Sequence, residues 1–150
     1  MDFYTLTALV LIAIAATSFM TLFSYSVSAA FRELYKEPVL LAYVLKKLNI
    51  KISNSSKKTA AWVLHYLIGL FFVVIYYILW KNKVVAISIL DILVVGAVTG
   101  LVGIIGWVLL FKVSNYKPHL DFTGYYVQLF LAHLIFTVTA AACYYLSLNL

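Results

Sequence analysis

The chain has 150 residues, of which 65% are hydrophobic and only 11% are charged, with a formal net charge of +6. Ordinary soluble domains have about 25% charged residues, and a soluble fold of this length cannot bury so large an apolar fraction. The composition therefore excludes a water-soluble domain. The few cations cluster beside apolar runs, which is typical of proteins that face a bilayer surface and not of proteins that bind nucleic acid.

Four apolar runs are long enough to cross a membrane. Spanning about 30 Å of hydrocarbon takes about 20 residues in a helix, and every backbone polar group must be paired inside lipid. Each run is therefore predicted to be a helix. The predicted spans cover about 4–30, 59–80, 89–111 and 122–146. The predicted fold is all-α, an integral membrane four-helix transmembrane bundle made by a single domain of residues 1–150.

A short helix is predicted between the first two spans, at about residues 38–48. Pro38 fits the first helical position, and Lys46 and Lys47 suit the carboxyl end. The segment is too short to cross the bilayer, so it is predicted to be a cytoplasmic interfacial helix. Two arrangements stay open: the helix lies among the lipid headgroups, or it packs over the mouth of the bundle.

Polar residues mark the starts of three spans. Ser88 and Asp91 have the spacing of a capping box, and Asp121 directly precedes the last span. A serine within residues 55–58 is predicted to cap the second span, because serine side chains accept hydrogen bonds from the first free backbone N–H groups of a helix.

The distribution of lysine and arginine predicts the orientation. Of the 11 cations, seven lie in residues 31–58 and two in the connection 112–121, whereas only Lys81 and Lys83 lie on the other side. Positive residues near spans stay in the cytoplasm. The prediction is a bacterial inner (plasma) membrane protein with both termini outside and the 31–58 loop cytoplasmic. Aromatic residues near span ends are assigned to interfacial belts; they include Trp107 and Tyr125.

Small residues predict which helix faces meet, because helices in lipid associate through close packing and polar contacts. Gly96, Gly100 and Gly103 form a stripe on the third span, and Gly69 lies on one face of the second. The GxxxG spacing predicts helix packing. It does not distinguish contact within the chain from contact with a second copy or another membrane protein.

A polar layer is predicted inside the membrane. Its members are His65, His133, Thr21 and Ser24. By helical rise, both histidines lie roughly 10–17 Å from the cytoplasmic ends of their spans. One interpretation is a neutral, hydrogen-bonded pair that fixes helix register. A second is proton or solute movement, which imidazole titration would serve. A third is a b-type haem between the two rings, against which the lack of a helical arginine for the propionates counts.

The cationic loop is a second candidate site. The residues predicted to bind anionic headgroups at the cytoplasmic face are Arg32, Lys36, Lys46 and Lys47. Glu33 and Glu37 would be the available bases of a lipid-modifying enzyme. The segment from Arg32 to Glu37 equally fits a solvated charge patch at a helix end.

The function that requires the least missing chemistry is non-enzymatic: an accessory or interaction protein that packs through its glycine-rich third span. The alternative is a lipid-handling membrane enzyme or an oligomeric transporter that uses the His65/His133 layer and the patch of residues 32–37. The single Cys143 excludes a disulfide within the chain and a thiolate metal cluster. No metal site and no cofactor are predicted.

Overall fold

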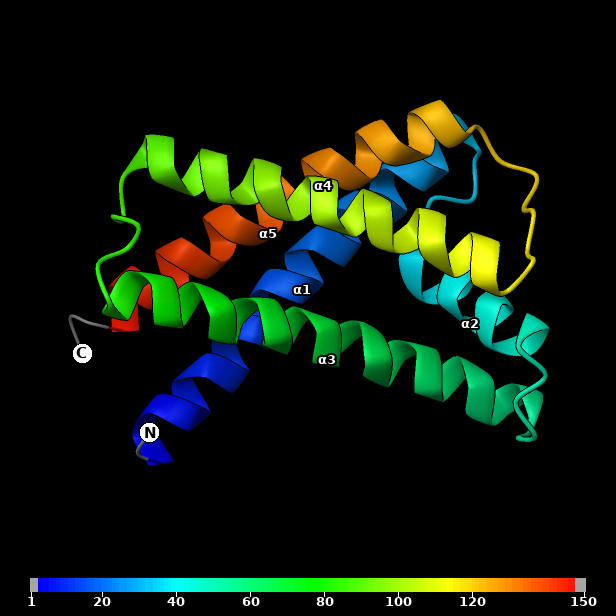
Figure 1. The fold of residues 1–150 in the computed structure, drawn as a ribbon, viewed down its shortest axis with the longest axis horizontal. Coiled ribbons are helices and arrows are strands. Elements are labelled where there is room, and N and C mark those ends of the chain that lie inside the picture. Colours follow the sequence, from blue (N-terminus) through cyan, green and yellow to red (C-terminus); the bar gives the residue numbers. More distant parts are fainter. Residues whose placement is uncertain (1–2, 148–150) are drawn as a thin grey trace.

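The computed structural model describes residues 3–147, which form five helices and no strand (Figure 1). The helices are α1 (Phe3–Phe31), α2 (Glu37–Lys47), α3 (Asn54–Lys81), α4 (Ile89–Val113) and α5 (Phe122–Ser147). The four longer helices are each long and apolar enough to cross a membrane. The predicted fold class, a four-span all-α bundle with a short helix between its first two spans, is confirmed.

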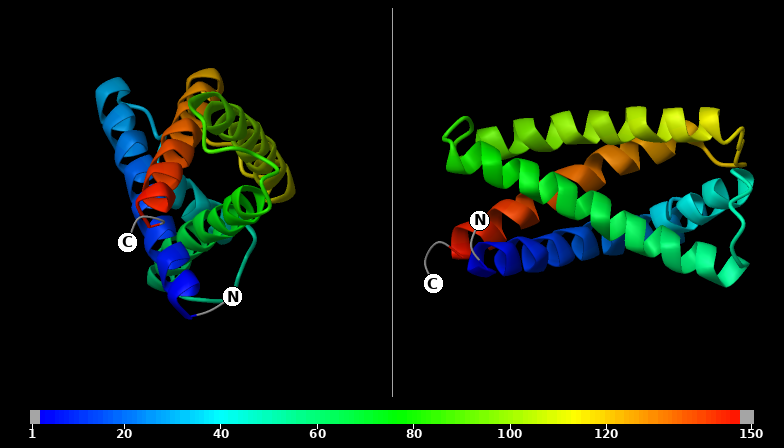
Figure 2. Two further views of the ribbon diagram at one scale, coloured as in Figure 1. Left: turned by 90° about the vertical axis from the view of Figure 1, so that its left-hand side faces the viewer. Right: turned by 60° about the horizontal axis from the view of Figure 1, so that its bottom comes forward.

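The long helices form two layers, with α1 and α5 on one side and α3 and α4 on the other (Figures 1 and 2). The amino end of α1 and the carboxyl end of α5 lie at the same end of the bundle as the α3–α4 connection. Helix α2 lies at the opposite end. The extensive helix pairs are α4 with α5, α1 with α5, α1 with α3, and α2 with α3. Helices α3 and α4 are not such a pair, so the layer that they form is open along its middle.

Small residues allow the close helix pairs, as lipid-embedded packing requires. A Cβ atom at Gly96 would lie 2.9 Å from the Leu134 side chain, and one at Gly100 would lie 2.9 Å from the Phe130 ring. A Cβ atom at Gly69 would collide with the Thr17 hydroxyl group on α1. The glycine face of α4 is therefore covered by α5 of the same chain.

A buried group of three hydroxyls joins α3, α4 and α5. The hydroxyl oxygen of Tyr76 lies 2.9 Å from Oγ1 of both Thr99 and Thr137. All three side chains are buried. The two threonines also donate to backbone carbonyl groups of their own helices, which keeps their cost in an apolar interior low.

The helix starts use the polar residues that the sequence indicated, with one shift. Ser88 accepts a hydrogen bond from the Asp91 N–H group and donates to the Asp91 carboxylate, and Asp121 accepts from the Thr123 and Gly124 N–H groups. The cap of α3 is Ser53, which accepts from the Ser56 N–H group. The prediction of a serine within 55–58 was wrong because α3 begins a turn earlier.

The chain reverses sharply between α1 and α2. Arg32 has a left-handed φ of 57°, and the Glu33 N–H group donates to the Ser28 carbonyl oxygen at 3.2 Å. This is the hydrogen bond of a Schellman helix end. The turn sends the chain back along α1, and Pro38 in the first turn of α2 starts the next helix.

Helix α2 therefore begins inside the bundle and not at its surface. Its buried side chains are Glu37, Pro38, Leu40, Leu41, Val44 and Leu45. Glu37 hydrogen-bonds Ser24, which lies seven residues before the end of α1, or about 10 Å by helical rise. The interpretation of residues 32–37 as a solvated patch was wrong for Glu37, because the break at Arg32 removes the continuous helix on which that spacing depended.

Candidate functional site

A cavity of about 320 Å³ lies between α3 and α4; we call it the histidine cavity. All five helices contribute to its wall. The residues used below are Thr17, Glu37, His65, Phe71, Phe72, Val102, Gly103, Gly106, Trp107 and His133. Phe71 is 62% exposed and Val102 is 49% exposed. The cavity therefore has a rim on the face of the bundle that the bilayer surrounds.

His65 on α3 is held by a threonine of α1. Its Nε2 atom lies 2.9 Å from Oγ1 of Thr21, and the Thr21 hydroxyl lies 2.7 Å from the Thr17 carbonyl oxygen, to which it donates. A hydroxyl has only one proton to donate, so the Thr21 oxygen accepts from Nε2. In the neutral imidazole, Nδ1 is then left as a hydrogen-bond acceptor.

His133 on α5 has the opposite tautomer. Its Nδ1 atom lies 2.8 Å from the Leu129 carbonyl oxygen, which can only accept, so Nδ1 carries the proton. This leaves Nε2 as an acceptor. A Cβ atom at Gly103 would lie 2.7 Å from this Nε2 atom, which places the acceptor edge of the ring against a glycine of the cavity wall.

Glu37 is the buried carboxyl group of the site. Its Oε1 atom accepts from the Ser24 hydroxyl at 2.7 Å and from the Gln128 amide at 3.2 Å, and its side chain is only 2% exposed. Burial raises the pKa of Glu37 to about 7, against the opposing effect of these two hydrogen bonds. Burial therefore favours the protonated carboxyl group at pH values at which an exposed glutamate is ionised.

Four buried side-chain polar atoms on α1, α2 and α5 have no hydrogen-bond partner within residues 3–147. They are Oγ1 of Thr17, Oε2 of Glu37, the hydroxyl of Tyr125 and Oε1 of Gln128. Unpaired buried polar atoms are rare in native folds and each calls for an explanation. Oε2 of Glu37 and Oε1 of Gln128 are acceptors, whereas the Thr17 and Tyr125 hydroxyls can each donate and accept, so both donors and acceptors are left unpaired in this interior.

The predicted polar layer separates into two groups. His65, His133 and the backbone of Thr17 and Leu129 belong to the cavity group, in which Thr21 is the direct partner of His65. Ser24 belongs to the second group and contacts Glu37 and Gln128. No hydrogen bond joins the two imidazoles in the described part of the chain.

Three residues of the site were assigned elsewhere by sequence reasoning. Gln128 was left outside the layer, although a lone amide in an apolar span signals a buried partner. Trp107 is 9% exposed and Tyr125 is fully buried, so both belong to the interior and not to an interfacial belt. Aromatic residues close to a span end fit either place, and the sequence gives no signal that separates the two.

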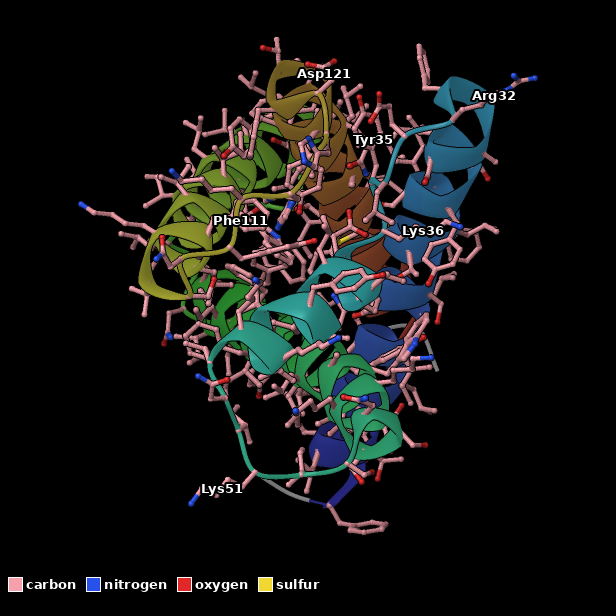
Figure 3. The ribbon with its side chains drawn as sticks, turned by 90° about the vertical axis from the view of Figure 1, so that its right-hand side faces the viewer. Arg32, Tyr35, Lys36, Lys51, Phe111 and Asp121 are labelled. Atoms are coloured by element: carbon pink, nitrogen blue, oxygen red, sulfur yellow. The ribbon has the colours of Figure 1, made fainter. Side chains whose placement is uncertain are left out.

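The predicted headgroup-binding residues do not form one cluster. The Arg32 side chain points away from the bundle at the tip of α1 (Figure 3). The Lys36 ammonium group lies 4.9 Å from the centre of the Tyr25 ring. Lys46 lines a groove beside α3, whereas Lys47 is exposed outside that groove.

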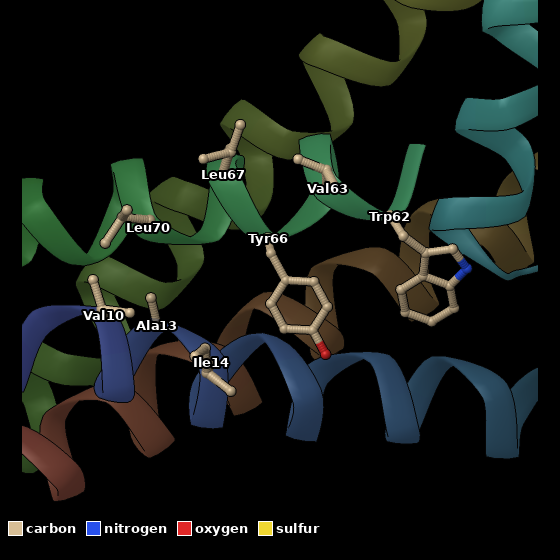
Figure 4. A pocket seen from close by; sticks show the side chains of 8 residues that line it. All are labelled: Val10, Ala13, Ile14, Trp62, Val63, Tyr66, Leu67 and Leu70. Atoms are coloured by element: carbon tan, nitrogen blue, oxygen red, sulfur yellow. The ribbon is translucent and has the colours of Figure 1, made fainter. Parts of the chain in front are cut away.

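A second groove, between α1 and α3, is almost purely hydrocarbon; we call it the apolar groove. It measures about 420 Å³ and is lined by Val10, Ala13, Ile14, Trp62, Val63, Tyr66, Leu67 and Leu70 (Figure 4). The Tyr66 hydroxyl turns towards α1, where it lies 3.0 Å from Oγ of Ser18. The one hydroxyl among the lining residues of this groove is thus already paired, so the groove fits a hydrocarbon chain.

Within residues 3–147 there is no group of three or more histidine, cysteine, aspartate or glutamate side chains placed to hold a metal ion. The interpretation of His65 and His133 as ligands of a b-type haem stays untested. Comparison with family models, with curated protein sequences and with solved structures gives no match for this chain. The fold and its four apolar helices define a small polytopic α-helical membrane protein.

Proposed function

We propose that the protein binds an amphiphilic molecule that enters the histidine cavity from the bilayer between α3 and α4. The observation that supports this most is the pair of imidazoles with opposite tautomers. Nδ1 of His65 and Nε2 of His133 are both left as acceptors, and Glu37 adds a carboxyl group to the same wall. A polar group that donates hydrogen bonds, such as a hydroxyl or an amine, satisfies such a site.

The apolar part of the ligand lies along the rim of the cavity. Phe71, Phe72 and Val102 offer hydrocarbon contacts there, and two of them are exposed to the lipid side. The volume is near the lower end of the range of small-molecule pockets, about 300–1,000 Å³. The cavity therefore holds the polar end and the first part of a chain, and the rest of the chain remains in the bilayer.

This proposal develops the lipid-handling alternative. The accessory role through the glycine-rich span has less support, because Gly96 and Gly100 already face Leu134 and Phe130 of the same chain. Gly106 is different: no atom lies within 4 Å of a Cβ atom built there, so it faces open space. The free glycine of α4 thus belongs to the cavity.

The test compares two probes that differ only in a hydrogen-bond donor, dodecanol and its methyl ether. Binding is followed by Trp107 emission in detergent, in protein that carries the Trp62→Phe and Trp80→Phe substitutions. Dodecanol is expected to change the emission saturably. The ether is expected to bind about tenfold or more weakly, since it leaves unpaired the acceptor to which the alcohol donates, at a cost of roughly 1–3 kcal/mol.

Two substitutions on α4 localise the binding. Gly106→Leu fills the open space in the cavity wall and is expected to abolish dodecanol binding, whereas Ile105→Leu on the exposed side of the same turn is the matched control. Equal affinity for alcohol and ether, or unchanged binding by the Gly106→Leu protein, would contradict the proposal.

A further inference from the structure

A groove beside the amino end of α3 gathers lysine side chains; we call it the lysine groove. It measures about 480 Å³ and lies between α2 and α3. Its lining residues are Pro38, Val39, Ala42, Tyr43, Lys46, Asn54, Lys57, Lys58 and Trp62. Three cations thus share one groove, and two of them were not among the predicted headgroup-binding residues.

The positive charge of this groove is not balanced within residues 3–147. Lys46, Lys57 and Lys58 form no ion pair with a described carboxylate. The first turn of α3 contains no acidic residue, although the positive end of a helix dipole favours negative charge there. Lysines placed at that end repel the dipole and one another, so an anion bound among them gains from all of these charges.

The lysine groove adjoins the apolar groove. Trp62 lines both, and it stands at the end of the apolar groove that is nearest α2 (Figure 4). From Trp62 to Leu70, the apolar groove follows α3 for about 12 Å by helical rise. A cationic site and a hydrocarbon channel that share one wall match the two parts of a phospholipid.

We propose that the two grooves together bind one anionic phospholipid of the surrounding bilayer. Its phosphate group lies among Lys46, Lys57 and Lys58. One acyl chain follows the apolar groove past Val63 and Leu67 towards Val10. The site is separate from the histidine cavity, with which it shares no lining residue, and it does not depend on the function proposed for that cavity.

The experiment is native mass spectrometry of the full-length protein with phosphatidylglycerol, phosphatidylcholine or inorganic phosphate added to the detergent. We expect phosphatidylglycerol to bind and phosphatidylcholine to bind about tenfold or more weakly, since each lysine near an anionic headgroup contributes to the affinity. Lys46→Gln, Lys57→Gln and Lys58→Gln together should abolish this preference. The matched control removes three lysines outside the groove: Lys47→Gln, Lys51→Gln and Lys112→Gln. Lys51 points away from the bundle (Figure 3).

A second variant tests the acyl chain. Val63→Trp obstructs the apolar groove and leaves the lysines in place, so it should weaken binding of long-chain phosphatidylglycerol and not of the dihexanoyl form. Three outcomes overturn the proposal: equal loss in the groove variant and in the control, phosphatidylcholine binding as tight as that of phosphatidylglycerol, or displacement of the lipid by equimolar inorganic phosphate. The last outcome would indicate a site for free phosphate. Thermal unfolding without added lipid verifies that each variant is folded.

Discussion

The absence of one Cβ atom at Gly103 determines where the His133 ring can lie. A Cβ atom there would come within 2.5 Å of Cε1 and 2.7 Å of Nε2 of the ring. The ring is also held by the hydrogen bond of its Nδ1 atom to the Leu129 carbonyl oxygen, and it lies nearly perpendicular to the Phe72 ring, whose centre is 6.1 Å away. A side chain at position 103 would therefore displace the ring and its acceptor nitrogen.

Alanine substitution at each of two glycines of α4 separates the effect of side-chain packing from that of helix propensity. Gly103→Ala is expected to lower the free energy of unfolding by about 1–3 kcal/mol, because the His133 ring must move. The added methyl group of Gly106→Ala meets open space. This substitution is expected to leave the free energy of unfolding unchanged or to raise it by up to about 1 kcal/mol. Thermal or denaturant unfolding in a mild detergent measures both. Equal destabilisation would show that residue 103 does not restrain the ring.

Glu37 makes stability depend on pH in a defined window. Its pKa is about 7 in the folded protein and 4.5 in the unfolded reference. The folded state therefore holds the proton more tightly, and the free energy of unfolding falls as pH rises from about 4.5 to about 7, by about 3 kcal/mol in all. Unfolding in detergent at a series of pH values within this window measures the decrease.

The substitution Glu37→Gln isolates this effect. A glutamine keeps an oxygen that accepts from Ser24 and Gln128 but does not titrate, so this contribution to the pH dependence should disappear. Glu33→Gln, four residues earlier, is the matched control and should retain it. A decrease with pH that persists undiminished in the Glu37→Gln protein would contradict the assignment.

Predictions for single residues succeeded where the role of the side chain depends on its neighbours in sequence. They failed where a tertiary contact determines whether the side chain is buried. The caps at Ser88 and Asp121 follow from the neighbouring residues alone. Glu37 was assigned to a solvated patch, since a sequence does not show that the chain turns back at Arg32 and buries Glu37. Its partner on α5, Gln128, lies 91 positions further along the chain.

At the scale of elements, the pairing of α4 with α5 has a direct test. A Cβ atom at Gly100 would lie 2.9 Å from the Phe130 ring and 3.4 Å from its backbone. Gly100→Ile should therefore lower the free energy of unfolding by about 1–3 kcal/mol. Because the contact lies within one chain, the loss should be the same at all protein concentrations.

The control for this test is Leu101→Ile, at the next position on the exposed side of α4. It should leave stability within about 0.5 kcal/mol of the starting protein. A Gly100→Ile protein that keeps its stability but loses an assembled state on size-exclusion chromatography would instead make this face a contact between chains.

The four long helices follow from the sequence because their length and hydropathy are imposed by the bilayer and not by neighbouring helices. The short helix was predicted at residues 38–48 and is observed at 37–47. Its insertion was not foreseen in this form, since both arrangements considered placed it outside the bundle. The depth of α2 depends on the turn after α1, which no periodicity in the sequence encodes.

At the scale of the whole molecule, the orientation in the membrane remains a prediction from the cations. Residues 31–58 and 112–121 contain nine of the 11 lysine and arginine residues, and both segments lie at the end of the bundle that holds α2. The side of the membrane on which a residue lies is tested by introducing single cysteines into a protein that carries Cys143→Ser. Lys47→Cys should be protected from a membrane-impermeant thiol reagent in intact cells, and Lys83→Cys should react. The reverse result would invert the predicted topology.

The number of spans and most of their limits could be predicted from composition and spacing, except that α3 begins at Asn54 and not near residue 59. The cavity could not. It exists because α3 and α4 are not a close pair, and that separation depends on how five helices fill space together. Two histidines in apolar spans indicate that something polar is buried, but their tautomers follow only from the Thr21 and Leu129 contacts.

Helix α2 touches both proposed binding sites. Glu37 at its first residue lines the histidine cavity, and Lys46 near its last lines the lysine groove, about 14 Å away by helical rise. If a molecule bound at one end shifts this short helix as a unit, the other end is altered as well. Thermodynamic linkage then requires that the phospholipid and the amphiphile change each other's affinity by the same factor. The lipid composition of the surrounding bilayer would thereby regulate occupancy of the protein's interior.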